Sequence, residues 1–128
     1  MYHPIIELLL MNGEYEQHKY CLKTFGTNKK PELSMNIHKL NRNMSQIRYF
    51  KRKRNPYMRG VYKAYQWVLF SINKAKIARD FVLLFKLDKW DDAEKLEFCL
   101  KKLDPYDYEC LMTSVNNELS TLRSYFTP

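Results

Sequence analysis

The chain has 128 residues and a mass of 15.6 kDa, which is the size of one domain. Hydrophobic residues make up 45% of it and aromatic residues 15%, so a disordered tail is excluded even at a formal net charge of +8. We therefore expect one folded domain over residues 1–128.

The charges are distributed unevenly along this domain. Twelve Lys or Arg residues and no acid lie between Glu32 and Asp80, in what we call the basic segment, residues 33–79. The residues before it are neutral overall, and those after it are acidic. Such asymmetry indicates an anionic partner, or one part of the molecule docking on another, and we favour the partner.

The start of the chain and its cysteines point to an intracellular protein. The apolar run at residues 5–11 is interrupted by Glu7 and lacks the flanks of a signal peptide or a membrane span. The cysteines, Cys21, Cys99 and Cys110, are odd in number and have no tight spacing, so we expect no disulfide framework. We expect a cytoplasmic protein, or a nuclear one in a eukaryotic host, with no membrane partner.

Glycine is scarce and no stretch alternates between apolar and polar residues, which predicts an all-α fold, a compact bundle of about five or six helices. The first helix is expected to have Pro4 in its first turn and to end at Gly13, which can adopt a left-handed conformation. A second helix is expected over residues 14–25, with Gly26 ending it.

A third helix is predicted by an apolar stripe with spacings of three and four, formed by Leu33, Ile37, Leu40, Met44 and Ile47. The stripe stops at residues 51–54, four cations that would surround a helix at about 100° each. Because burying unpaired charge is costly, this turn is expected to project from the packed body. Asn55 and Pro56 are expected to end the helix.

A long central helix is expected from about residue 57 or 60, because apolar residues occupy two of its sides. One side carries Val61, Tyr65, Val68, Ile72 and Ala75, and the other carries Trp67, Phe70, Ile77, Phe81 and Leu84. Periodicity does not decide between helix and strand for residues 81–87.

Two further helices complete the predicted bundle. Residues 90–103 begin with acids and end with Lys101 and Lys102, which suits a helix dipole. Asp104 and Pro105 are typical of the N-cap and first position of a last helix. Its apolar arc either covers the core or forms a homodimer seam, and it contains Tyr108, Leu111, Met112, Val115, Leu119, Leu122 and Phe126.

The sequence contains no strong catalytic signature, and we predict a protein that is not an enzyme. Its acids fall in patterns such as Asp91-Asp92, which are typical of helix starts rather than of a catalytic pair. His18 and Cys21 could supply two zinc ligands, but the paired short spacings of structural zinc sites are missing. We expect neither a metal nor another cofactor.

The candidate site is a basic helix-loop-helix corner at residues 48–63, "RYFKRKRNPYMRGVYK", with seven cations and no acid. Lys and Arg neutralise phosphates, and aromatic rings between them can stack on unpaired bases, although each ring has core packing as its alternative. The predicted binding residues are Arg42, Arg48, Lys51, Arg52, Lys53, Arg54, Arg59 and Lys63, with Tyr49, Phe50, Tyr57 and Tyr62 as candidate stacking rings.

The predicted function is therefore non-enzymatic binding of nucleic acid, DNA or RNA, mainly through phosphates and with weak sequence specificity. The alternative is a small viral, phage or mobile-element accessory protein that binds and modulates a protein partner, such as a nucleic-acid-processing enzyme. A nuclear-import signal also fits "KRKR".

Overall fold

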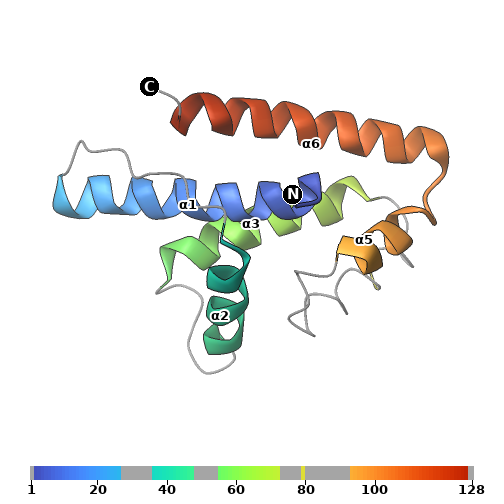
Figure 1. Cartoon of the computed structure of the whole chain (residues 1–128). Coiled ribbons are helices and arrows are strands. Elements are labelled where there is room, and N and C mark those ends of the chain that lie inside the picture. The colour runs from blue at the N-terminus through green and yellow to red at the C-terminus, as the bar shows by residue number, and fades with distance from the viewer. Residues whose placement is uncertain (1, 27–35, 48–54, 73–78, 80–92, 127–128) are drawn as a thin grey trace.

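The computed structural model describes residues 2–26, 36–47, 55–72, 79 and 93–126, which form five helices and, within these ranges, no strand. The helices are α1 (Pro4–Phe25), α2 (Ile37–Ile47), α3 (Pro56–Ser71), α5 (Ala93–Leu100) and α6 (Pro105–Phe126). In Figure 1, α6 runs beside α1, while α3 and α2 lie on the other side of α1. The all-α prediction is confirmed, and the question of helix or strand at residues 81–87 lies outside the described residues.

Helix α1 is one continuous helix, so the prediction that Gly13 ends a short first helix is wrong. Gly13 serves packing instead, because a Cβ atom there would lie 2.9 Å from Tyr57 Cε2 and 3.0 Å from Val61 Cγ2. The predicted stop at Gly26 is confirmed. This residue has φ 65°, which favours glycine, and its N–H donates to the Leu22 carbonyl at 2.9 Å.

Helix α3 crosses α1 at very close range. A Cβ atom at Gly60 would lie 2.2 Å from the Asn12 carbonyl oxygen and 2.8 Å from Glu16 Cβ. The Asn12 side-chain amide also donates to the Gly60 carbonyl at 2.6 Å. The two glycines thus let the backbones of α1 and α3 meet, and α3 contacts both α1 and α2, while α1 contacts both α3 and α6.

The boundaries of α2 and α3 differ in part from the prediction. Helix α2 ends at Ile47, where its apolar stripe was expected to run out. Asn55 caps the start of α3, since its side-chain oxygen accepts the Met58 N–H at 3.2 Å. The predicted continuation of the preceding helix through residues 51–54 lies outside the described residues. Helix α3 stops at Ser71, because the backbone of Ile72 is extended rather than helical. The prediction that this helix continues through Ile72 is therefore wrong.

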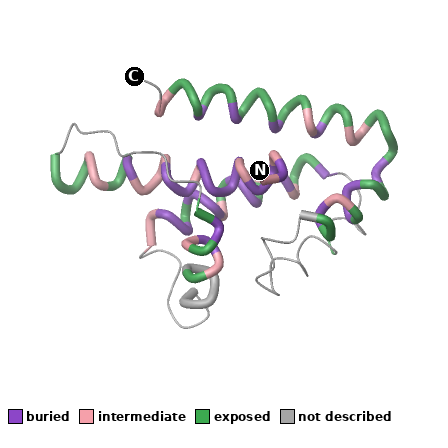
Figure 2. Tube along the Cα trace, viewed as in Figure 1, coloured by how far each residue is buried: buried purple, intermediate pink, exposed green. Residues whose placement is uncertain are grey.

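Helix α6 covers the core with one narrow stripe. Most of the helix is exposed (Figure 2). The four buried residues all belong to its predicted apolar arc and are Leu111, Val115, Leu119 and Leu122. The predicted N-cap is present, because Asp104 Oδ1 accepts the Tyr106 N–H at 3.3 Å. These four residues of the arc therefore cover the core of one chain.

Polar contacts fix the two ends of α1. Arg123 of α6 pairs with Glu7 at 2.5 Å, and the His18 ring shares a hydrogen bond with the Tyr125 hydroxyl. At the start of α1, His3 Nδ1 accepts the Ile5 N–H at 3.1 Å, and His3 Nε2 lies 2.7 Å from Glu97 of α5.

No helix in the described part of the chain is long and apolar enough to cross a membrane.

Candidate nucleic-acid interface

The structure describes four of the residues predicted to bind nucleic acid. They are Arg42 on α2 and Tyr57, Arg59 and Lys63 on α3, with Tyr62 as a further candidate ring on α3. The other predicted residues lie outside the described residues: Arg48, Tyr49, Phe50, Lys51, Arg52, Lys53 and Arg54. Their flanking helices, α2 and α3, contact each other and so hold the ends of this stretch on one body.

A side chain must be exposed to contact a phosphate, and those of Arg42 and Arg59 are. Neither forms an ion pair with another residue that the structure describes. A guanidinium group carries five N–H donors in a planar fork, which matches a phosphate group. These two arginines are therefore available to an anionic partner.

Lys63 is exposed but is already paired. Its Nζ atom lies 3.2 Å from Glu16 Oε1 on α1, and its side chain is 58% exposed. An ion pair this exposed contributes little to stability. The ammonium group keeps further donors for a ligand, although the neighbouring carboxylate offsets part of its charge.

Tyr57 is not a surface residue, and its assignment as a stacking ring is a wrong prediction. It is only 1% exposed and packs in the core, and Lys39 Nζ lies 4.4 Å from its ring centroid. Burial raises the pKa of Tyr57, and the negative charge of Glu14 adds to this effect. Core packing, the alternative weighed for each ring, accounts for Tyr57, while Tyr62 is half-buried against the core.

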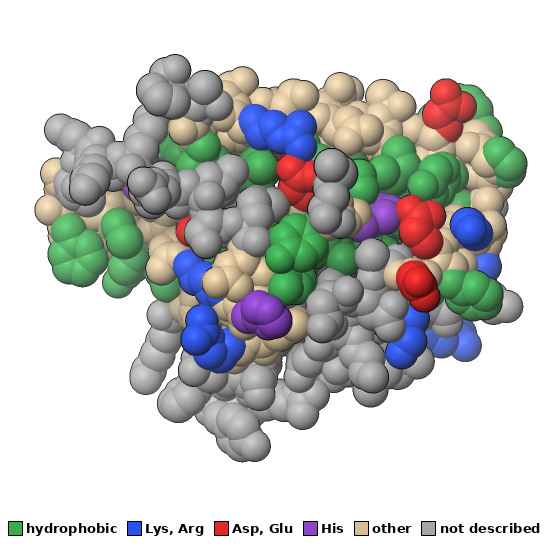
Figure 3. All heavy atoms as spheres, viewed as in Figure 1, with side chains coloured by type: hydrophobic (Ala, Val, Ile, Leu, Met, Phe, Trp, Pro, Cys, Tyr) green, Lys and Arg blue, Asp and Glu red, His purple; other side chains and the backbone are tan. Residues whose placement is uncertain are grey.

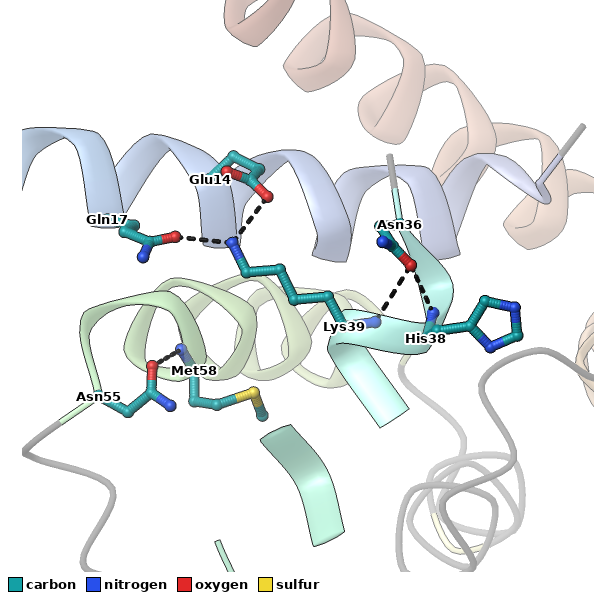
Figure 4. A network of polar contacts seen from close by, with 7 residues as sticks. All are labelled: Glu14, Gln17, Asn36, His38, Lys39, Asn55 and Met58. Atoms are coloured by element: carbon teal, nitrogen blue, oxygen red, sulfur yellow. Dashed lines mark hydrogen bonds and ion pairs between the residues drawn. The ribbon is translucent and has the colours of Figure 1, made fainter. Parts of the chain in front are cut away.

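A polar network joins the basic segment to α1, as Figure 4 shows. Lys39 Nζ donates to Glu14 Oε1 at 3.1 Å and to Gln17 Oε1 at 2.9 Å. Glu14 is only 6% exposed, so the carboxylate depends on this cation. Asn36 positions Lys39, since its side-chain oxygen accepts the N–H groups of His38 at 3.0 Å and Lys39 at 3.2 Å.

The described acids of α1 are thus all paired: Glu7 with Arg123, Glu14 with Lys39 and Glu16 with Lys63. Figure 3 shows, on one face, acidic side chains (red) beside basic ones (blue) and beside histidine (purple). The docking reading of the charge asymmetry therefore applies in part, and the anionic partner stays a prediction. Two lysines of the basic segment dock on α1, while its described arginines stay exposed.

Sequence reasoning missed the outer face of α3. Phe70 was expected to face the core, but it is 91% exposed, and Trp67 is half-buried. The core-facing prediction for Phe70 is wrong because the buried side of α3 is the opposite one. The polar residues Arg59, Lys63 and Gln66 share the exposed side, and their spacing could have placed Phe70 there.

A small pocket adjoins this face. Its volume is about 170 Å³, and α1, α3 and α6 all contribute to it. Its lining residues are Leu8, Asn12, Lys63, Ala64, Trp67 and Glu118. The pocket therefore combines an aromatic ring with one cation and one carboxylate.

His18 and Cys21, the two zinc ligands considered from the sequence, both lie on α1, and His18 shares a hydrogen bond with the Tyr125 hydroxyl. Within the described ranges, no three His, Cys, Asp or Glu side chains gather as metal ligands.

No family model matches the chain, and no curated protein or solved structure matches it either.

Proposed function

We propose that the protein binds nucleic acid through the basic corner at residues 48–63 and through Arg42 on the adjoining helix. The observation that carries this proposal is the excess positive charge of the basic segment. It contains no acid, the described acids of α1 are already paired, and Arg42 and Arg59 are exposed. A phosphate backbone supplies the missing negative charge.

Binding of this kind is mainly electrostatic and therefore depends on salt. About six phosphate contacts would lower the affinity roughly a thousandfold between about 50 and 200 mM salt. Phosphate contacts position a protein without reading sequence, so we expect weak discrimination among sequences of one strand type. No catalytic step forms part of the proposal.

The test is a salt titration of binding to labelled single-stranded DNA, duplex DNA and RNA. A variant with Arg52, Lys53 and Arg54 changed to Ala is expected to bind at least tenfold more weakly at low salt. Its slope of log affinity against log salt should fall by about two to three, since each lost phosphate contact removes nearly one unit.

A second triple variant controls for the loss of net charge. Lys95, Lys101 and Lys102 are exposed and lie outside the basic segment, so changing them to Ala removes the same charge elsewhere. This control should keep nearly all of the affinity and the salt slope. Equal losses in both variants would show that only net charge matters, and the corner would then not be the site.

The proposal fails if none of the nucleic acids binds the unmodified protein at about 50 mM salt. A protein that then co-purifies from the native host would support the alternative, an accessory protein that modulates a protein partner. The same basic corner is the surface to test for that partner, with the same two triple variants.

A further inference from the structure

The outer face of α3 carries two cations, an amide and an aromatic ring in one row. Arg59, Lys63, Gln66 and Phe70 are all exposed, and they lie within about 60° of one another at about 100° per residue. The row extends about 16 Å along the helix axis at about 1.5 Å per residue. In the sequence it begins a few residues after the cations at positions 51–54.

Phe70 has no packing role that explains it. At 91% exposure it is the most exposed large hydrophobic residue in the described part of the chain. Burying such a ring is worth about 1.5–3 kcal/mol to a fold, and here the fold gains almost none of it. A single exposed apolar residue is ordinary, but this one shares a helix face with two cations and follows a second aromatic residue, Trp67, by three positions on the helix.

Trp67 extends the aromatic surface toward the pocket of about 170 Å³. Its ring and Lys63 both line this pocket, and Glu118 reaches it from α6. A carboxylate is unfavourable for a phosphate, but it accepts hydrogen bonds from the exocyclic amine of a base. The Asn12 side-chain amide, also in the lining, already donates to the Gly60 carbonyl.

We infer that the outer face of α3 is a track for a single-stranded nucleic acid. Arg59 and Lys63 contact the phosphates, Phe70 stacks on one base, and the pocket beside Trp67 takes another base whose amine donates to Glu118. This inference rests on the proposed function and narrows the proposed ligand from any nucleic acid to a single strand. Phe70 and Trp67 need unpaired bases, because the base faces of a duplex are stacked on one another.

The test compares Phe70→Ala with a matched control, Phe98→Ala. Phe98 is also an exposed phenylalanine, at 65%, but it lies on α5 outside the basic segment. Phe70→Ala is expected to weaken binding of a single-stranded oligonucleotide about 5- to 100-fold, with the salt slope unchanged because no phosphate contact is lost. Binding to a duplex of equal length and the behaviour of Phe98→Ala should stay as in the unmodified protein.

Two conservative variants separate stacking from a general apolar contact. Phe70→Tyr should keep the affinity for the single strand, since it keeps the aromatic face, while Phe70→Leu should lose it like Phe70→Ala. If Phe70→Leu binds as well as the unmodified protein, stacking at this position is overturned. Because Phe70 is almost fully exposed, all three variants should fold normally.

The failure of this inference differs from the failure of the proposed function. If Phe70→Ala binds a single strand as tightly as the unmodified protein, while the Arg52, Lys53 and Arg54 variant still loses affinity, the track is wrong and the basic corner stands. If the unmodified protein binds no nucleic acid, both fail.

Trp67 offers an independent reading. In a Trp90→Phe background it is the one remaining tryptophan, so its fluorescence reports on the pocket alone. Saturation with a single-stranded oligonucleotide should quench this emission, and saturation with a duplex should leave it nearly unchanged. Unchanged emission with the bound single strand overturns the assignment of Trp67 to the track.

Discussion

On its inner face α3 meets α1 through Gly60, whereas on its outer face the same helix presents two cations and a phenylalanine that is 91% exposed. The inner face tolerates almost no added atom, because the two backbones are in contact there. The outer face carries Arg59 and Phe70, whose side chains contribute little to the fold. Because these two side chains contribute little to the stability of the fold, they are candidates for a role in binding.

The largest effect should come from breaking the inner face. Gly60→Ala places a Cβ atom 2.2 Å from the Asn12 carbonyl oxygen, which belongs to a helix backbone and cannot move aside alone. The helices must separate, so we expect the free energy of unfolding to fall by about 3–5 kcal/mol, measured by urea denaturation.

Two controls accompany this substitution. Gly13→Ala meets mainly the side chain of Tyr57, which can shift slightly, so its loss should be smaller. Gln66→Ala on the outer face should change stability by less than about 0.5 kcal/mol. A Gly60→Ala protein as stable as the unmodified one would contradict the close crossing of α1 and α3.

Much of this fold could be predicted from local sequence signals. The stop at Gly26 and the cap at Asp104 both depend on neighbouring residues in the chain. The role of Gly13 could not be predicted in this way. A glycine that ends a helix and a glycine that admits a second helix look alike until the partner helix is known.

In the candidate site, too, some features follow from the local sequence and others depend on tertiary contacts. Lys39 and Arg42 are cations of one segment on one helix, yet only Lys39 meets a buried carboxylate. Which cation is paired depends on where α1 lies, and the local pattern does not contain that information. Tyr57 and Phe70 were likewise misassigned, since an aromatic ring favours neither core nor surface without its tertiary contacts.

A second substitution tests the charges of the two regions. Lys39→Met leaves Glu14 buried without its cation, so we expect a loss of about 3 kcal/mol in urea denaturation. Glu14→Gln should cost less, because Lys39 is partly exposed and its ammonium group can reach water.

The matched exposed pair is Lys63 and Glu16. Lys63→Met should cost less than about 1 kcal/mol, since its side chain is mostly in water. Similar losses for Lys39→Met and Lys63→Met would remove the distinction between the buried ion pair and the exposed one.

The smallest effect should appear on acidification, which acts on His3 but not on the arginines. Burial lowers the pKa of His3, although Glu97 opposes the shift. Its Nδ1 accepts the Ile5 N–H, so the folded protein holds the neutral ring with its proton on Nε2, toward Glu97. The unfolded chain then binds more protons, and stability should fall as the pH drops through the unfolded pKa of about 6.5.

His3→Asn keeps an N-cap acceptor but cannot titrate in this range. Between about pH 7.5 and 5.5 the unmodified protein should lose more stability than this variant, because only its unfolded chain gains a proton on residue 3. Equal losses in urea denaturation would mean that His3 does not couple folding to pH. Nucleic-acid affinity at fixed salt should change little over the same range while the protein stays folded, because Arg42 and Arg59 remain charged throughout it.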